Sequence, residues 1–319
     1  MISLHSRPAI GGARLMGFGV HRPSSLLYSD DLGKRWGKDG DWVRARTGMN
    51  SRTIAAEDES LSDMAIGAAR GAVEASGLAP GQIDLIIVAS CSTAPPRGSA
   101  DVVAAAIGAT GAAGTDLNAA CAGFCYSLAV AADSVRMGSA QHVLVVGAER
   151  MSTFVDPDDL PTAIVFGDGA GAVVVGPSDD PGIGPVVWGS DGAQKDLITI
   201  ETNQIMTMQG QAVFRWATSE IHPVALEACR RAGVPVEELA AIVPHQANLR
   251  IVDHLARKID APKAVVARDG ADTGNTSAAS IPLALHRLID EGQLLSGDLA
   301  LLVGFGAGLT YAAQVVRLP

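Results

Sequence analysis

The run Leu85-Ile86-Ile87-Val88 consists only of aliphatic residues, and similar runs recur later in the chain. They are Val143-Leu144-Val145-Val146, Ala172-Val173-Val174-Val175 and Leu299-Ala300-Leu301-Leu302-Val303. Short uninterrupted aliphatic runs are typical of strands that are buried on both faces of a sheet. We therefore expect residues 85–88 to form such a strand, with layers of structure on either side.

Segments with helical periodicity alternate with these runs. They span residues 61–76, 124–137, 221–231 and 281–289, and each is closed by glycine or a glycine-rich turn. The alternation of buried strands and amphipathic helices predicts an α/β protein.

The same order of elements occurs twice. A helix, a glycine, a strand, a helix and a strand follow one another in each half, and Gly77 and Gly147 match Gly233 and Gly304 at spacings of 156 and 157 residues. This agreement suggests an internal duplication. The segment 176–184, rich in Pro, Asp and Gly, is the natural connection. We therefore expect two similar halves, residues 1–178 and 179–319.

The composition excludes several classes of protein. At 319 residues, 48% hydrophobic and 18% charged, the chain can bury a sizeable core. Its net charge of −10 argues against a general nucleic-acid binder. We find no signal peptide and no apolar run of membrane-spanning length. The four cysteines form no CxxC pair and have no histidine at metal-ligand spacing, so we expect no metal site, no membrane insertion and a cytoplasmic location.

Cys121 is the first candidate for chemistry. It stands in Asn118-Ala119-Ala120-Cys121-Ala122-Gly123-Phe124, directly before a helical pattern. A thiol at a helix N-terminus has its thiolate stabilised, which lowers the pKa and activates the sulfur toward thioesters. The alternative is a buried, inert cysteine. Cys125, one turn later, fits that alternative better.

Two further segments carry polar residues at the expected sheet edge. His245 follows a strand that ends in Val243-Pro244, and Asn275 lies in the turn Gly274-Asn275-Thr276-Ser277-Ala278-Ala279-Ser280 before a helix. Ligands of α/β proteins gather where strands end, and an amide in a turn can donate hydrogen bonds to an oxyanion. A structural histidine and an ordinary helix cap are the alternatives.

Taken together, CAGF, PHQAN and GNTSAAS stand in an order and spacing that resembles the β-ketoacyl-acyl carrier protein synthase III family. The resemblance covers nearly the whole chain, including residues 42–48, the glycine-rich residues 166–172, and Gly304-Phe305-Gly306-Ala307-Gly308-Leu309. It implies a five-layered α/β/α/β/α thiolase fold and a homodimer. The two glycine-rich stretches would be tight turns around the active site.

The resemblance also implies a reaction. Cys121 would accept the acyl group of an acyl-coenzyme A. Malonyl-acyl carrier protein would then lose carbon dioxide while His245 and Asn275 donate hydrogen bonds to its thioester oxygen, and the carbanion would attack the acyl group. Backbone N–H groups of Cys121 and Ala307 would hold the resulting oxyanion. No metal or redox cofactor is implied.

Binding residues follow from the same resemblance. Trp42 and Arg46 would hold the adenine end of coenzyme A, although Trp42 could equally be a core residue, and Gly210 and Asn248 would line the pantetheine channel. The docking patch for the acidic carrier protein would comprise Arg215, Arg250, Arg257 and Lys258. For Arg257 and Lys258 the alternative is an ordinary solvated surface.

Some positions depart from the family pattern. Leu160 stands where relatives often have an arginine of the adenine clamp. The segment 92–99, which shapes the acyl pocket across the dimer in the family, carries two prolines and an arginine, and the stretch 194–209 looks short. The starter acyl group therefore stays open.

Other activities fit less well. A priming enzyme or acyltransferase of a specialised pathway would carry the same three residues. A biosynthetic thiolase should have a second cysteine in the glycine-rich segment 304–308, which has none. The GNTSAAS match argues against hydroxymethylglutaryl-coenzyme A synthase, and a non-catalytic scaffold typically loses the nucleophile.

Overall fold

The computed structural model describes residues 11–92, 99–200 and 205–319 and contains two five-stranded sheets. The first sheet has the order β1 (Gly12–His21), β7 (Asp168–Ser178), β6 (Val143–Arg150), β4 (Leu85–Ala89), β5 (Ala113–Leu117). The second has the order β8 (Val187–Ser190), β14 (Thr310–Arg317), β13 (Leu299–Gly306), β11 (Ala241–Pro244), β12 (Val265–Val266). Two small ribbons complete the strands: β2 (Ser25–Tyr28) with β3 (Ser51–Ile54), and β9 (Ile198–Ile200) with β10 (Met206–Met208).

The two sheets have the same topology. In each, the first two pairings across the sheet are antiparallel and the last two are parallel. Strands β1, β7, β6, β4 and β5 thus correspond to β8, β14, β13, β11 and β12. The strands of the first sheet all end by Ser178, and those of the second begin at Val187. The expectation of two similar halves is confirmed by this shared topology.

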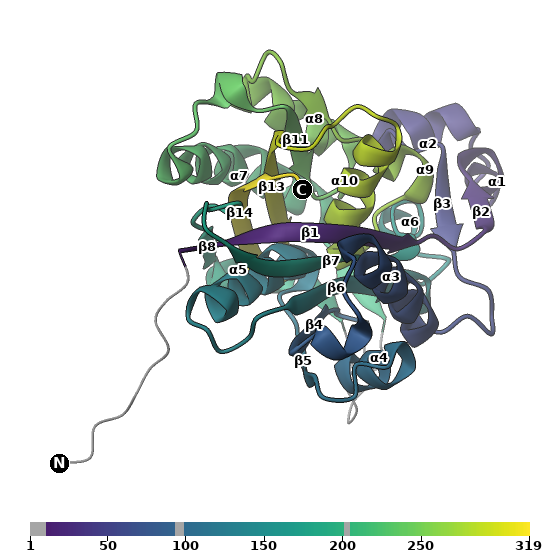
Figure 1. The fold of residues 1–319 in the computed structure, drawn as a ribbon. Helices are drawn as coiled ribbons and strands as arrows, with labels where there is room; N and C mark the ends of the chain where they lie inside the picture. Colours follow the sequence, from purple (N-terminus) through teal and green to yellow (C-terminus); the bar gives the residue numbers. More distant parts are fainter. Residues whose placement is uncertain (1–10, 93–98, 201–204) are drawn as a thin grey trace.

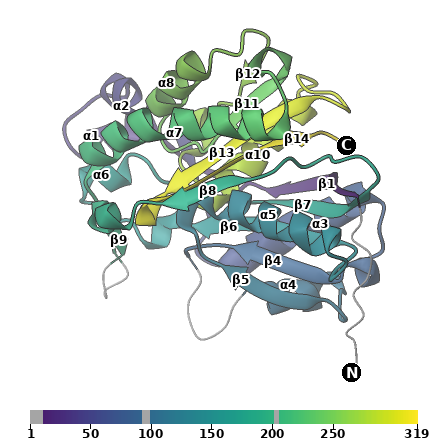
Figure 2. The ribbon, with the colours of Figure 1, turned by 90° about the vertical axis from the view of Figure 1, so that its left-hand side faces the viewer.

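Helices form three layers around the two sheets (Figures 1 and 2). The first outer layer is α3 (Leu61–Ser76) and α4 (Ala100–Ile107), the second is α7 (Gly210–Ala232) and α8 (Leu249–Ile259), and α5 (Gly123–Arg136) and α10 (Ser280–Asp290) lie between the sheets. The shorter helices are α1 (Ser29–Lys34), α2 (Gly40–Thr47), α6 (Leu160–Ala163) and α9 (Gly270–Thr273). The predicted five-layered order is therefore confirmed.

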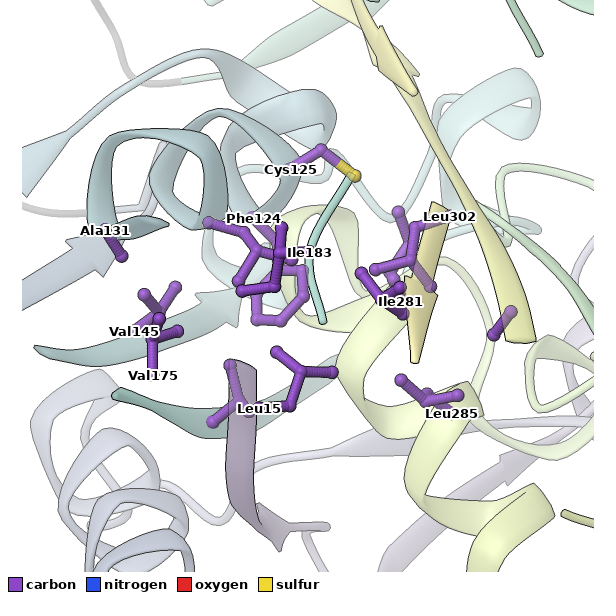
Figure 3. Close-up of a cluster of buried hydrophobic side chains, with 14 of the residues drawn as sticks. Leu15, Phe124, Cys125, Ala131, Val145, Val175, Ile183, Ile281, Leu285 and Leu302 are labelled. Carbon is purple, nitrogen blue, oxygen red and sulfur yellow. The ribbon is translucent and has the colours of Figure 1, made fainter. Parts of the chain in front are cut away.

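Alternate residues of each strand face different layers, which explains the continuous aliphatic runs. Ile86 and Val88 pack with the helices of the first outer layer, whereas Ile87 joins the central cluster. Figure 3 shows that central cluster, where Phe124 on α5 and Ile281 on α10 lie between Val145 and Leu302 of the two sheets.

Gly147 and Gly304 occupy equivalent positions and allow the central layer to approach each sheet. A Cβ atom at Gly147 would lie 2.5 Å from the carbonyl oxygen of Ala278, just before α10. A Cβ atom at Gly304 would lie 3.0 Å from the Cα atom of Ala122, just before α5. Each half therefore provides a gap for the start of the other half's central helix.

We expect Gly147→Ala to lower the free energy of unfolding by about 1–3 kcal/mol, because the backbone at Ala278 must shift to admit the methyl group. Chemical denaturation followed by circular dichroism measures this effect. Gly81→Ala is the control, since a Cβ atom at Gly81 meets no atom within 4 Å. Equal unfolding midpoints for the two variants would contradict the close approach.

Several expectations need correction. The helix expected at 221–231 is part of the much longer α7, whose buried side chains include Trp216 and Ala217. The glycine-rich segment at 168–172 is the beginning of β7 rather than a tight turn. Glycine is required at 171 because a Cβ atom there would lie 2.8 Å from the side chain of Pro282 in α10. The expected connection at 176–184 begins three residues later than predicted, since Gly176 to Ser178 still pair with β1. Residues 93–98 and 201–204 of the two unusual segments lie outside the described residues.

Candidate active site

A cavity of about 800 Å³ lies where the two halves meet. Cys121, His245 and Asn275 all contribute to its wall, together with Ala307. Much of the remaining wall is apolar: Met151, Ile164, Phe166, Met206, Met208 and Phe214. The structure thus brings the three sequence-predicted residues to one cavity, although they are far apart in the chain.

Cys121 lies in a short 3-10 helix, η2 (Ala120–Ala122), that leads directly into α5. Ala120 has a positive φ of 47°, and its N–H donates to Oδ1 of Asn118 at 3.0 Å. This turn carries the chain from β5 into the central helix and leaves the cysteine partly exposed at the cavity. The predicted position at the start of a helix is confirmed.

The thiol does not have the low pKa expected from that position. Burial raises the pKa of Cys121 to about 12, and the buried carboxylate of Glu149 acts in the same direction. Hydrogen bonding to Ser277 and to the backbone of Cys121 and Ala307 opposes the shift without reversing it. Loss of water around the sulfur outweighs these donors, so the resting thiol is protonated.

The glycine-rich loop of the second half gives the nucleophile its room. Gly306 is the last residue of β13, and a Cβ atom there would lie 2.7 Å from Cβ and 3.0 Å from Sγ of Cys121. Ala307 follows at the cavity wall. Because the backbone of Ala307 contributes to lowering the thiol pKa, its N–H group faces the sulfur region.

His245 follows β11 directly, as the sequence predicts, and its backbone N–H donates to Val303 at 2.8 Å. The side chain is buried, and its Nδ1 lies 2.7 Å from Oγ of Ser280. The Ser280 oxygen also accepts the N–H of Gln246, at 3.4 Å, so its hydroxyl proton is available to Nδ1. When the Ser280 hydroxyl donates to Nδ1, the proton of the neutral ring lies on Nε2.

Burial lowers the pKa of His245 to about 3. The imidazole is therefore neutral at physiological pH and cannot form an ion pair with a thiolate. A neutral ring with a proton on Nε2 can donate a hydrogen bond to a developing negative charge.

Asn275 is held at the cavity by both halves of the protein. Its backbone N–H donates to Val165 at 2.9 Å, and its carbonyl accepts the N–H of Gly167 at 3.0 Å. The preceding Gly274 has a φ of 74°, and a Cβ atom there would lie 2.6 Å from the side chain of Arg52. The side-chain Oδ1 accepts the N–H of Ser277 at 2.9 Å, which leaves Nδ2 free to act as a donor.

Only some of the residues expected to hold coenzyme A line the cavity. Arg46, Gly210 and Asn248 line it, whereas Trp42 packs at the edge of a neighbouring hydrophobic cluster. The guanidinium carbon of Arg46 lies 3.6 Å from the centre of the Trp42 ring, so Arg46 itself occupies one ring face. Asn248 caps α8 and donates through Nδ2 to the backbone carbonyl of Arg46 at 3.0 Å.

The four basic residues expected to dock a carrier protein fall into two groups. Arg215 on α7 and Arg250 on α8 are exposed at the cavity wall, whereas Arg257 and Lys258 are exposed in the last turn of α8, outside the cavity lining. Across residues 11–92, 99–200 and 205–319, none of these side chains takes part in an ion pair.

Sequence reasoning missed Glu149, Ser277 and Ser280. Glu149 and Ser277 bond to each other, and Ser280 bonds to His245. The two serines lie in the GNTSAAS segment beside Asn275, and this position is the signal that marks them as candidate site residues. Glu149 follows the aliphatic run at 143–146, where a charged residue normally marks the exposed end of a strand. The neighbouring residues therefore do not indicate that it is buried.

Among the residues that the structure describes, no helix is long and apolar enough to cross a membrane, and no cluster of His, Cys, Asp and Glu is arranged to hold a metal ion. All four cysteines are free thiols.

Two halves of the same topology, with a shared layer of helices between their sheets, define the thiolase fold. Two family models match, described as 3-oxoacyl-[acyl-carrier-protein] synthase III over residues 115–192 and its C-terminal part over residues 229–318. Beta-ketoacyl-[acyl-carrier-protein] synthase III 4 of Streptomyces coelicolor is 48% identical, and the alignment covers 97% of this chain and 99% of that protein.

Solved structures agree with these matches. The priming β-ketosynthase from the R1128 polyketide biosynthetic pathway superposes with a TM-score of 0.95 at 43% identity, covering 98% of both chains. 3-Oxoacyl-[acyl-carrier-protein] synthase III from Aquifex aeolicus superposes with a TM-score of 0.90 at 39% identity, covering 96% of this chain and 100% of that one. The chain belongs to the β-ketoacyl-acyl carrier protein synthase III family of condensing enzymes.

Proposed function

We propose that the cavity carries out a two-step condensation in which Cys121 is the nucleophile, and His245 and Asn275 are the donors that stabilise negative charge. In the first step the Cys121 sulfur attacks the carbonyl of an acyl-coenzyme A. The carbon–sulfur bond to coenzyme A breaks as the bond to Cys121 forms, and the thiol proton passes overall to the leaving sulfur. Coenzyme A thus departs as a thiol, and the acyl group stays on Cys121 as a thioester.

In the second step malonyl-acyl carrier protein takes the place of coenzyme A. The bond between its carboxylate and the α-carbon breaks, carbon dioxide leaves, and the electron pair becomes an enolate of the thioester. Nε2 of His245 and Nδ2 of Asn275 donate to the enolate oxygen. The α-carbon then attacks the acyl-Cys121 carbonyl. Collapse of the oxyanion releases a 3-oxoacyl carrier protein and the Cys121 thiolate, which takes up a proton from solvent.

The backbone N–H groups of Cys121 and Ala307 hold that oxyanion. Loss of carbon dioxide drives the bond formation, so this reaction uses no metal or redox cofactor. The observation that carries the proposal is the convergence of Cys121, His245 and Asn275 on one cavity from separate elements of the two halves. The free thiols are compatible with the predicted reducing, cytoplasmic location.

The substrates are tested with a panel of straight and branched acyl-coenzyme A thioesters and malonyl-acyl carrier protein. Mass spectrometry of the carrier protein should show a 3-oxoacyl product whose chain is that of the starter plus two carbons. The starter with the highest kcat/KM identifies the physiological acyl class. If no starter yields a 3-oxoacyl carrier protein, the proposed condensation is wrong.

A second candidate role is priming of a polyketide or other specialised pathway. The R1128 priming ketosynthase is a close structural match, which favours this alternative. The chemistry is the same in both roles, so the starter panel distinguishes them: a strong preference for one unusual acyl group indicates a specialised priming role.

A homodimer is also part of this proposal. Within the part of the chain that the structure describes, strand β5 ends the first sheet and pairs only with β4, and its residues Ala113 to Asp116 are exposed. A free, exposed strand edge is a template for pairing with a second chain. Two copies joined at β5 would continue the sheet across the interface. Sedimentation equilibrium should give twice the chain mass.

We expect Arg215→Glu to raise KM for malonyl-acyl carrier protein by roughly tenfold at low ionic strength, because carrier proteins are acidic and Arg215 lies at the cavity wall. The effect should shrink as salt is added. Arg230→Glu is the matched control: it makes the same charge change on the same helix, at its far end. Equal KM values for the two variants would contradict docking at the cavity mouth.

A further inference from the structure

Glu149 is a buried carboxylate that the proposed mechanism does not use. It is the last residue but one of β6 and has 0% exposed surface. Its carboxylate accepts hydrogen bonds from both halves of the protein. The donors are Ser277 Oγ at 2.9 Å, the Cys91 N–H at 3.1 Å, the Ala278 N–H at 3.4 Å, Ser90 Oγ at 3.1 Å and Ser92 Oγ.

Among the described residues, no cationic side chain accompanies this carboxylate. Across the described ranges 11–92, 99–200 and 205–319, Glu149 takes part in no ion pair with Lys, Arg or His. Removing a carboxylate from water without a counter-charge is costly, and burial raises the pKa of Glu149. Hydroxyl and N–H donors, together with the Cys91 thiol at 3.5 Å, offset that cost. A stabilising role is therefore a poor explanation for a carboxylate at this position.

The hydrogen bonds lead from Glu149 to Asn275 in two steps. The carboxylate accepts the hydroxyl proton of Ser277, and the backbone N–H of Ser277 donates to Oδ1 of Asn275 at 2.9 Å. This second bond fixes which end of the Asn275 amide faces Ser277. Nδ2 is then left for the cavity. The orientation of Asn275 thus depends on where the backbone of Ser277 is held.

Comparison of the two halves shows that this arrangement is an addition to one of them. At the spacing of 157 residues that relates Gly147 to Gly304, Ser277 corresponds to Ala120 and Glu149 to Gly306. Ala120 and Ser277 both have a φ of 47°. Each also donates its N–H to the asparagine two residues earlier, Asn118 or Asn275. The turn and its bond to the amide therefore form without the hydroxyl or the carboxylate, so what Glu149 adds in the second half is the placement of that turn. Gly306 of the second half is equivalent to Glu149 of the first half, and its lack of a side chain leaves space for Cys121.

We propose that Glu149 is a positioning residue that acts through Ser277 to aim the Asn275 amide at the substrate during condensation. The inference rests on the role proposed for Asn275. It assigns the carboxylate to the second half-reaction and gives it no part in acyl transfer to Cys121.

The test measures the two half-reactions separately in Glu149→Gln. An amide of the same shape has one acceptor oxygen, so its NH₂ group must face one of the donors that Glu149 now binds. We expect condensation of preformed acyl-enzyme with malonyl-acyl carrier protein to slow by roughly 10–100-fold. Acylation by acyl-coenzyme A should be unchanged or faster, because loss of the carboxylate charge removes one cause of the raised pKa of Cys121.

A double-variant cycle tests whether Glu149 acts through Asn275. If it does, Glu149→Gln combined with Asn275→Ala should condense no more slowly than Asn275→Ala alone. Ser277→Ala should reproduce the condensation defect, and Ala120 shows that alanine tolerates the required backbone. Ser90→Ala is the control, because its hydroxyl bonds the carboxylate oxygen that does not contact Ser277.

The outcomes separate this inference from the proposed function. Multiplied losses in the double variant, or parallel losses in both half-reactions, would overturn the positioning role. If Asn275→Ala slows condensation but Glu149→Gln and Ser277→Ala do not, this inference alone fails. If Asn275→Ala has no effect, the role of Asn275 itself is wrong. Should Glu149→Gln fail to fold, the condensation rate of Ser277→Ala, alone and combined with Asn275→Ala, still decides the question; its acylation rate does not, because Ser277 also acts on the Cys121 thiol.

Discussion

Replacing Cys121 with alanine is expected to abolish the acyl-enzyme and to lower the rate of 3-oxoacyl product formation by at least roughly 10⁴-fold. The substitution removes the only atom to which the starter can be attached in the proposed mechanism. Little else changes, because the neighbouring residues at 119, 120 and 122 are already alanines. Intact-protein mass after incubation with acyl-coenzyme A measures the adduct directly.

Cys125→Ala is the matched control. Cys125 lies one turn further along α5, is fully buried, and packs in the central hydrophobic cluster (Figure 3). We expect this variant to lose some stability but to retain the adduct. An adduct that persists in Cys121→Ala, or that disappears in Cys125→Ala with the fold intact, would assign the nucleophile to a different cysteine.

Removing either hydrogen-bond donor of the condensation step, His245 or Asn275, should also slow the reaction strongly. We expect His245→Ala and Asn275→Ala each to slow condensation by roughly 10²–10³-fold, which is the usual cost of removing one donor from an oxyanion site. Acylation of Asn275→Ala should remain near the wild-type rate, because its amide acts on the malonyl thioester. Single-turnover measurements of each half-reaction by mass spectrometry separate the two effects.

The two half-reactions should respond differently to pH. The pKa of His245 is lowered to about 3, so its imidazole stays neutral and condensation should not change with His245 protonation from roughly pH 5 upward. The pKa of Cys121 is raised to about 12, so the thiolate fraction grows with pH. Acylation should therefore rise between roughly pH 6 and 9. A condensation rate that falls across roughly pH 6 to 7 would show that a charged histidine is required.

Much of the fold follows from short-range sequence patterns. The run at 85–88 predicts a buried strand because a strand between two helical layers needs aliphatic residues on both of its faces. In the structure Ile86 and Ile87 do face different layers. The repeated glycines predicted the duplication. Gly77 and Gly233 both end an outer helix in the left-handed conformation, and Gly147 and Gly304 both receive the opposite central helix.

The parts that could not be predicted depend on contacts between distant segments. The raised pKa of Cys121 comes from burial in the assembled cavity and from Glu149, neither of which its own segment indicates. Glu149 is visible as a site residue only when Ser277, 128 residues away, is placed beside it. Arg46 stacks on Trp42 in the structure. The family resemblance predicted that both side chains contact coenzyme A, but it did not predict that they contact each other, because that depends on side-chain packing.

In the proposed mechanism, one cysteine holds the starter until the malonyl carrier discharges it. The direct measurement is a chase: acyl-enzyme is formed with labelled acyl-coenzyme A, freed of excess donor, and mixed with malonyl-acyl carrier protein while both masses are followed. We predict that the label leaves Cys121 and appears on the carrier as a 3-oxoacyl chain at the same rate. Label that stays on the enzyme, or leaves only as free acid, would contradict the account.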